Sequence, residues 1–237
     1  MQAMSAMPNR TEMNRPVRRR LDVLLADRGL AETRTKAQSL IMAGCVLVDG
    51  QVVDKPGSAV KEDSELFVNA GLPYVSRGGV KLAGALDEFR IDVKGLIAMD
   101  VGSSTGGFTD CLLKRGAAFV YAVDVGKGIL DYTIRNDPKV RVLEQRNIRK
   151  LEFAEIGRKV DIVVIDVSFI SLELVLPKVM EFVKDGGVVL ALIKPQFEVG
   201  KGLVGKGGIV RDPEKHRVVV ERITAFCGAA GFKPVAT

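Results

Sequence analysis

Hydrophobic and polar residues follow two different patterns along this chain, and the change falls near residue 70. In the first part, leucines at helical spacing from residue 21 onward predict one helix, and residues 34–43 predict a second. The turn formed by Asp49 and Gly50 between valine-rich stretches predicts a hairpin. These features indicate a small α+β domain over residues 18–69, preceded by a disordered tail over residues 1–17.

The second part alternates wholly apolar runs with amphipathic stretches. The expected strands are residues 96–101, 118–123, 140–143, 162–165 and 188–193, and the expected helices are 76–89, 108–114, 130–136, 172–183 and 213–226. Strands that alternate with helices are typical of an α/β fold with a parallel sheet covered on both faces. The sequence therefore predicts a doubly wound, mostly parallel sheet over residues 76–237, joined to the first part by a short linker at 70–75.

Composition and charge narrow the classes of protein. The chain has 237 residues, of which 47% are hydrophobic and 27% charged, and no apolar run is long enough to span a membrane. Cys45, Cys111 and Cys227 are widely spaced and odd in number, which fits reduced thiols in the cytoplasm. The charged N-terminus does not resemble an export signal. A formal net charge of +6 is compatible with a polyanionic partner.

The strongest chemical signal is the turn between the strand at 96–101 and the helix at 108–114. The strand carries Asp100 near its end, and the turn is rich in glycine and serine. Glycines let a ligand approach the main chain, and a helix N-terminus offers free N–H groups. The spacing Gly-x-x-x-Gly-Gly fits neither the dinucleotide fingerprint nor a phosphate-binding loop. By itself this turn is compatible with a ligand site and with an ordinary strand-to-helix connection.

A second carboxylate favours the ligand site. Asp124 ends the next strand, roughly 20 residues on, where an acid can bind a ribose diol. A carboxylate at the turn repels a pyrophosphate but suits an ammonium or a sulfonium. This combination resembles the S-adenosylmethionine site of Rossmann-like methyltransferases, with a contact to adenine expected after the following strand. The cofactor contacts so implied are Asp100, Gly102, Ser103, Ser104, Gly106, Gly107, Phe108, Asp124 and Asn147.

Two further strand ends carry charged residues. Asp166 follows the apolar run 162–165, and Lys194 follows the run 188–193. The carboxyl ends of parallel strands meet at one edge of a sheet, where ligands bind. We therefore expect Asp100, Asp124, Asp166 and Lys194 to form one site.

Two other motifs are interpreted as structural. Residues 200–207 nearly spell a P-loop, but Gly207 stands where a hydroxyl must bind Mg²⁺, so we predict a loop there. His216, the only histidine, is expected to face solvent. A lone histidine gives no support to histidine-rich zinc sites or histidine relays, and no metal site is predicted.

The first part resembles the S-four-type RNA-binding domain of ribosomal proteins and RNA-modifying enzymes. The match runs from Arg20 to Val68 and includes the pattern Thr-Arg-x-x-Ala-x-x-Leu-Ile-x-x-Gly-x-Val-x-Val-x-Gly that starts at Thr33. The alternative is a small domain whose arginines only confer solubility. The resemblance implies phosphate-backbone contacts, which position RNA without reading its sequence, by Arg18, Arg20, Arg34, Lys36 and Gln38.

From Arg20 onward, nearly the whole chain resembles the TlyA family, which is named for haemolysins and understood as ribosomal RNA 2′-O-methyltransferases. The resemblance rests on five motifs: Val-Ser-Arg-Gly-Gly-x-Lys-Leu at 75–82, Asp-x-Gly-x-Ser-Thr-Gly-Gly-Phe-Thr at 100–109, Arg-Asn-Asp-Pro at 135–138, Asp-x-Ser-Phe-Ile-Ser-Leu at 166–172 and Lys-Pro-Gln-Phe-Glu-Val-Gly-Lys-Gly at 194–202. The resemblance implies S-adenosylmethionine as cofactor and ribosomal RNA or ribosomal subunits as partner.

The family's catalytic set resembles that of the FtsJ-type RNA methyltransferases, namely Lys, Asp, Lys and Glu. The first three correspond to Lys81, Asp166 and Lys194. In this assignment Lys194 is the base, Lys81 its electrostatic partner and Asp166 its orienter. The glutamate is expected beyond Thr237, so the chain is expected to lack the last strand or strands of the sheet.

Two rival interpretations belong to other classes. A pore-forming haemolysin would need amphipathic segments that insert into a membrane, or segments that span it, and the sequence shows neither. A non-catalytic RNA-binding module would keep the first domain but has no use for four charged residues at one sheet edge. Binding of S-adenosylmethionine distinguishes the enzyme from both.

Overall fold

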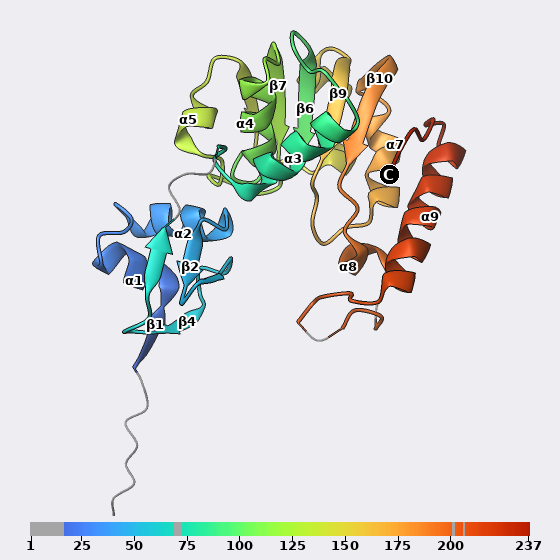
Figure 1. The fold of residues 1–237 in the computed structure, drawn as a ribbon. Helices are drawn as coiled ribbons and strands as arrows, with labels where there is room; N and C mark the ends of the chain where they lie inside the picture. The colour runs from blue at the N-terminus through green and yellow to red at the C-terminus, as the bar shows by residue number, and fades with distance from the viewer. Residues whose placement is uncertain (1–16, 69–72, 201, 206) are drawn as a thin grey trace, which may run out of the picture. The chain divides into compact units, whose positions relative to one another are not determined.

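The structure is a computed structural model that describes residues 17–68, 73–200, 202–205 and 207–237. Its contacts divide the chain into two units, Met1–Asn69 and Ala70–Thr237 (Figure 1). The tail expected at 1–17 lies outside the described residues except for Val17, and the linker expected at 70–75 is described only from Pro73 onward.

The first unit contains the expected helices and hairpin. Its helices are α1 (Leu21–Asp27) and α2 (Arg34–Met42), and its three-stranded antiparallel sheet has the order β3-β2-β5, formed by β2 (Val46–Val48), β3 (Gln51–Val52) and β5 (Leu66–Val68). Asp49 and Gly50 both have positive φ, at 49° and 76°, as a tight turn between β2 and β3 requires. Leu21, Leu25 and Ile41 are fully buried where the two helices meet the sheet.

A second, two-stranded sheet in this unit is absent from the sequence prediction. β1 (Arg18–Arg20) pairs antiparallel with β4 (Ala59–Lys61). Three consecutive arginines show no alternation of apolar and polar residues, so the sequence carries no strand signal there. The pairing partner, about 40 residues away, makes this segment a strand.

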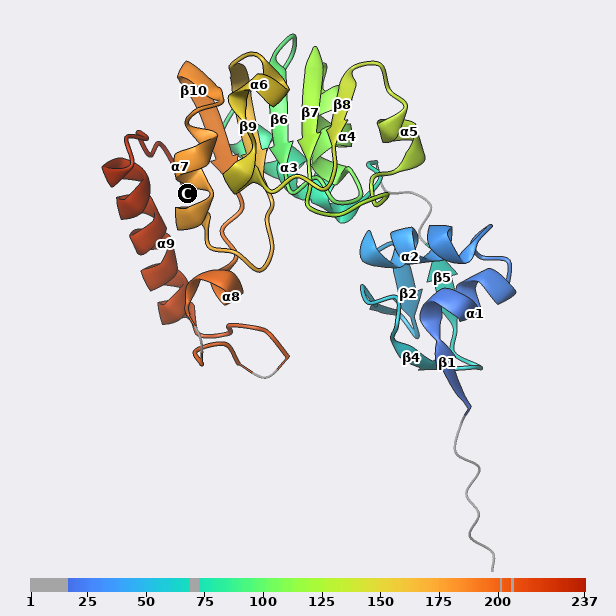
Figure 2. The ribbon, with the colours of Figure 1, turned by 180° about the vertical axis from the view of Figure 1, so that it is seen from behind.

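The second unit is built on a five-stranded parallel sheet, which confirms the predicted fold class. Its strands are β6 (Ile97–Val101), β7 (Phe119–Val123), β8 (Val140–Leu143), β9 (Val160–Ile165) and β10 (Val183–Ala191), in the spatial order β10-β9-β6-β7-β8 (Figure 2). All four neighbouring pairs are parallel. The order reverses direction at β6, and such a switch point leaves a crevice at the carboxyl ends of the strands.

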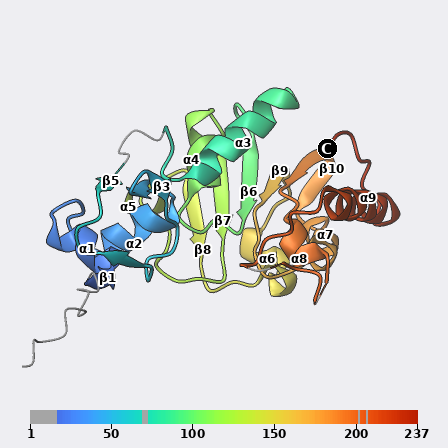
Figure 3. The same ribbon diagram turned by 60° about the horizontal axis from the view of Figure 1, so that its bottom comes forward.

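Helices cover both faces of this sheet, as Figure 3 shows. One face carries α3 (Arg77–Glu88) and α4 (Gly107–Lys114), and the other carries α6 (Phe153–Ile156), α7 (Leu176–Val179) and α9 (Pro213–Ala229). Alternate strand residues enter the two cores: Ala98 packs on the α3 and α4 side, whereas Met99 packs on the α7 and α9 side. The remaining short elements are α5 (Tyr132–Arg135), η1 (Ile148–Lys150), η2 (Leu172–Leu174) and α8 (Pro195–Glu198).

The single helix predicted over residues 172–183 is wrong. The chain forms the 3-10 helix η2, then the short helix α7, and Val183 already pairs with Val160 as the start of β10. Pro177 lacks the backbone N–H that a continuous helix would use, so it is accepted only in the first turn of a new helix. A register shift between Val183 and Val188 then carries β10 past two glycines.

Candidate functional site

The carboxyl ends of four neighbouring strands bring together the charged residues expected to form the site. Asp100 lies on the central strand β6, directly opposite Ala122 of β7 and Val164 of β9 in register. Asp124 follows β7, Asp166 follows β9, and Lys194 follows β10 after two intervening residues. Parallel strands therefore place three carboxylates and one ammonium at the same edge.

Asp100 is a fully buried carboxylate with an incomplete set of hydrogen bonds. Its Oδ2 accepts a hydrogen bond of 2.7 Å from Thr109 Oγ1 of α4, while its Oδ1 has no partner among the described residues. Burial raises the pKa of Asp100 to about 7; the Thr109 hydrogen bond opposes this, and the charges of Asp166 and Asp124 add to it. A buried carboxylate with one free oxygen suits a cationic ligand.

The turn after β6 requires glycine because the chain passes close to another backbone. Gly102 has a φ of 88°, and a Cβ at this position would lie 2.7 Å from the carbonyl oxygen of Asp166. The amide N–H of Asp166 in turn donates to Val101 O at 3.0 Å. The turn is thereby locked against the segment that follows β9.

Asp124 organises the same turn from the β7 side. Its Oδ2 accepts a hydrogen bond from the amide of Ser104 at 2.8 Å, and its Oδ1 accepts one from the amide of Gly126 at 2.7 Å. Ser104 has a positive φ of 48°, a conformation that this hydrogen bond helps to hold. Each carboxylate oxygen still has a lone pair for a ligand hydroxyl.

Lys194 and Asp166 form an ion pair at this edge. Lys194 Nζ lies 2.6 Å from Asp166 Oδ1 and donates a hydrogen bond of 2.9 Å to Ser168 Oγ. Both side chains are about four-fifths buried, and the ammonium lies 5.9 Å from the centroid of the Phe197 ring. The lysine is thus held in one position. Ser168 belongs to a motif that the sequence singled out, but the sequence assigned it no role.

The other predicted site residues have different surroundings. Lys81 is exposed on α3, and no hydrogen bond or ion pair joins it to the Lys194 pair within the described ranges. Asn147 is exposed after β8 and caps η1, its Oδ1 accepting from the amide of Arg149. Phe108 is buried in the hydrophobic core beside α3, so its ring packs against the core and stabilises the turn after β6. Ser103, Gly106 and Gly107 lie buried in that turn.

His216 differs from expectation. It is half-buried, and its Nε2 lies 2.7 Å from the carbonyl oxygen of Val210, so it does not face solvent freely. In the parts of the chain that the structure describes, no three His, Cys, Asp or Glu side chains are grouped so that they could hold a metal ion.

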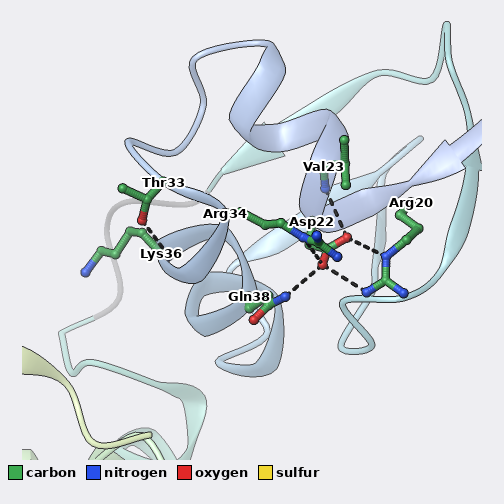
Figure 4. Close-up of polar contacts among 7 residues, drawn as sticks. All are labelled: Arg20, Asp22, Val23, Thr33, Arg34, Lys36 and Gln38. Carbon is green, nitrogen blue, oxygen red and sulfur yellow. Dashed lines mark hydrogen bonds and ion pairs between the residues drawn. The ribbon is translucent and has the colours of Figure 1, made fainter. Parts of the chain in front are cut away.

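In the first unit, three of the predicted RNA contacts converge on one buried acid that the sequence did not reveal. Asp22 is fully buried in α1 and accepts hydrogen bonds from Arg20, Arg34 and Gln38 at 2.8 to 3.0 Å (Figure 4). Its Oδ1 also accepts from the amide of Val23. The Arg20 hydrogen bonds lower the pKa of Asp22 more than burial raises it, and Gln38 and Arg34 lower it further.

This network fixes two guanidinium groups while leaving them half exposed. The side chains of Arg20 and Arg34 keep 52% and 54% of their accessible surface, although their partner is fully buried. Arg20 uses Nε and Nη2 for Asp22, and Arg34 uses Nε. A guanidinium has five N–H donors, so each group retains donors that Asp22 does not use. Arg18, on the same strand as Arg20, donates to Ala59 O at 3.2 Å, and the amide of Lys36 is capped by Thr33.

Comparison with known proteins identifies the class. The chain belongs to the FtsJ-like methyltransferase family, whose model matches residues 74–237, and an S4 domain matches residues 19–66. Both resemblances expected from the sequence are confirmed.

Several relatives match most of the chain. The 16S/23S rRNA (cytidine-2′-O)-methyltransferase TlyA of Mycobacterium tuberculosis is 50% identical over 199 residues, which cover 83% of this chain and 74% of that relative. Hemolysin A of Brachyspira hyodysenteriae is 41% identical over 217 residues, which cover 91% of this chain and 90% of that relative. A solved structure from Streptococcus thermophilus, which carries a hemolysin name, has 45% identity and a TM-score of 0.69 over 91% of this chain and 79% of that chain. No helix within the described ranges is long and apolar enough to cross a membrane.

Proposed function

We propose that this protein transfers a methyl group from S-adenosylmethionine to a ribose 2′-hydroxyl of ribosomal RNA. The observation that carries the proposal is the Lys194–Asp166 ion pair at the same sheet edge as the partly unpartnered carboxylate of Asp100. Family membership and the 50% identical TlyA relative support the reaction class and the substrate. We propose that the reaction takes place in the cytoplasm, where ribosomal RNA is found.

The residues at the edge of the sheet fit the proposed cofactor. Asp100 offers a buried anionic oxygen, Asp124 offers two carboxylate oxygens where a ribose diol would lie, and the turn that includes Gly102, Ser103, Ser104, Gly106 and Gly107 lets a ligand approach the main chain. Asn147 is the proposed contact to adenine. When bound, S-adenosylmethionine supplies an electrophilic methyl group.

The chain's own residues then act on the hydroxyl. The proposed proton acceptor is Lys194 Nζ as the neutral amine, which takes the hydroxyl proton and becomes the ammonium. Asp166 and Ser168 hold Lys194 in place, and Lys81 is its proposed electrostatic partner. Alignment of the hydroxyl with the methyl group accounts for much of the acceleration.

The first unit is the proposed RNA-binding surface. Arg20 and Arg34 are held by Asp22 with free N–H donors, so they can receive phosphate oxygens without a large loss of side-chain freedom. Arg18, Lys36 and Gln38 complete the set proposed for this surface. Such contacts position the RNA, and they would make its binding dependent on salt.

Substitution of Lys194 tests the proposed reaction. Lys194→Ala should lower methyl transfer roughly 10²- to 10⁴-fold while cofactor and RNA affinities stay within twofold. Lys184→Ala is a matched control, because Lys184 lies near the start of β10, the strand that Lys194 follows, and forms an ion pair of 2.6 Å with Asp161 there. If Lys194→Ala turns over within a few-fold of the wild type, Lys194 is not the base, and Lys81 becomes the next candidate.

A further inference from the structure

Glu198 is a buried acid beside the proposed site to which neither the sequence nor the reaction assigns a role. It is 4% exposed at the end of α8. Its Oε2 accepts a hydrogen bond of 2.7 Å from Ser171 Oγ, and its Oε1 accepts one of 2.8 Å from the amide of Leu172. Arg222 of α9 lies 3.1 Å from Oε2 and also donates to the Glu198 carbonyl oxygen at 2.8 Å.

These contacts join the two segments that carry the proposed catalytic pair. Asp166 and Ser168 lie in the segment after β9, and Lys194 precedes α8 after β10; both segments leave the sheet at the same edge, beside α8 (Figures 1 and 2). Lys194 links the segments at one end through Asp166 and Ser168. Glu198 links them again at the other end.

Neither segment is held in place by its own secondary structure. Residues 166–171 contain no helix or strand, and Phe169 has a positive φ of 64° although the residue is 90% exposed. A bulky residue in that conformation persists only where its surroundings restrain it. The helix α8 has four residues, too few to be stable alone. By contrast α9 has 17 residues, so Arg222 offers a firm anchor.

We infer that Glu198 is a positioning residue that sets the distance between Asp166 and Lys194. This inference rests on the proposed function. The charge-assisted hydrogen bonds of Glu198 connect both segments to α9 through Arg222. Misplacement of a catalytic group by about 1 Å can lower the rate roughly 10²-fold. Loss of Glu198 should therefore affect turnover more than binding.

The kinetic test uses graded variants and a matched control. Glu198→Ala should lower kcat about 10- to 10²-fold, while the KM for RNA and the Kd for the cofactor stay within about twofold of the wild type. Glu198→Gln should lower kcat less, because the glutamine oxygen still accepts a hydrogen bond from the amide of Leu172. Glu173→Gln is the control, because Glu173 also binds Arg222, at 3.3 Å, but its carboxylate does not hold residues 166–171. Ser171→Ala should lower kcat mildly and combine non-additively with Glu198→Ala. The inference is wrong if kcat falls only in proportion to the folded fraction, or if the two effects add.

A second measurement is independent of methyl transfer. The chain contains no tryptophan, so Phe169→Trp introduces a single tryptophan into the segment, and it can be excited selectively over the three tyrosines. In that background Glu198→Ala should lower the fluorescence anisotropy, whereas Glu173→Gln should leave it unchanged. Unchanged anisotropy in Glu198→Ala refutes the positioning role. If the anisotropy falls while the otherwise unsubstituted protein transfers no methyl group, the proposed reaction fails but the role of Glu198 in holding the segment stands.

Discussion

Asp100→Asn should make the stability of the second unit less dependent on pH. Burial raises the pKa of Asp100 from its ordinary value of 3.8 to about 7, so the folded protein binds this proton more tightly than the unfolded chain. Between pH 4 and pH 7 the native state holds a proton that the unfolded state has lost. In the wild type, stability from this group is therefore present below pH 4 and is lost as pH rises to 7.

The structure sets the size of this effect. A change in pKa from near 4 to about 7 corresponds to about 4 kcal/mol, because each pKa unit is worth about 1.4 kcal/mol. The carboxylate is fully buried, so solvent does not screen this cost. Asparagine keeps an oxygen that can accept the Thr109 hydrogen bond, but it cannot ionise. The difference in unfolding free energy between the variant and the wild type should therefore grow by about 4 kcal/mol between pH 4 and pH 7.

Urea unfolding of both proteins at intervals from pH 4 to pH 9 measures the difference, which should level off above pH 7. A difference that does not vary with pH would refute the reasoning.

Ligand binding gives the complementary measurement. A sulfonium beside ionised Asp100 offsets the cost of burying that charge, so S-adenosylmethionine should bind more tightly as pH rises through 7. S-adenosylhomocysteine, which keeps its ammonium but lacks the sulfonium charge, should not. Calorimetry on the wild type and on Asp100→Asn tests this contact. A direct contact between Asp100 and the sulfonium would be contradicted if both ligands showed the same pH dependence in the wild type. It would also be contradicted if S-adenosylmethionine kept its pH dependence in Asp100→Asn.

Three further predictions follow from single contacts. Asp124→Ala should weaken cofactor binding by about 1 to 3 kcal/mol in calorimetry, because it removes the proposed bidentate contact to the ribose hydroxyls and leaves the Ser104 and Gly126 amides without their acceptor. Gly102→Ala should destabilise the second unit by about 1 to 3 kcal/mol in urea unfolding, because its Cβ would meet the Asp166 backbone. Asp22→Ala should destabilise the first unit by about 2 to 4 kcal/mol and weaken RNA binding, since it releases two guanidinium groups.

The Asp22 contribution also has a defined pH dependence. The pKa of Asp22 is lowered, so its stabilisation is present above the unfolded value near 4 and is lost as pH falls towards the folded value. Asp27→Ala is the control, because Asp27 lies on the same helix but is half exposed in its pair with Arg19. Equal losses of RNA affinity in the two variants would remove Asp22 from the RNA-binding surface.

Unchanged cofactor affinity in Asp124→Ala would remove Asp124 from the cofactor site, and a fully stable Gly102→Ala would contradict the close packing at that turn.

The sequence by itself determined the sheet and the location of the site. Continuous apolar runs mark the core strands, which are buried on both faces, and the polar residue at the end of each run must lie at the common carboxyl edge of a parallel sheet. Asp100, Asp124, Asp166 and Lys194 were placed by this reasoning alone. The turn at Gly102 was also readable, because a strand, a glycine-rich turn and a helix occur there in succession.

Only the tertiary structure decided which polar groups are partners. Asp22 binds residues 12 and 16 positions later on a separate helix, and Glu198 binds Ser171 across 27 residues. Such contacts leave no periodic trace in the sequence, because they depend on how helices and loops pack. The same holds for the pairing of β1 with β4. The break at Pro177 had a local signal, but only the pairing of Val183 with Val160 shows where the helix gives way to β10.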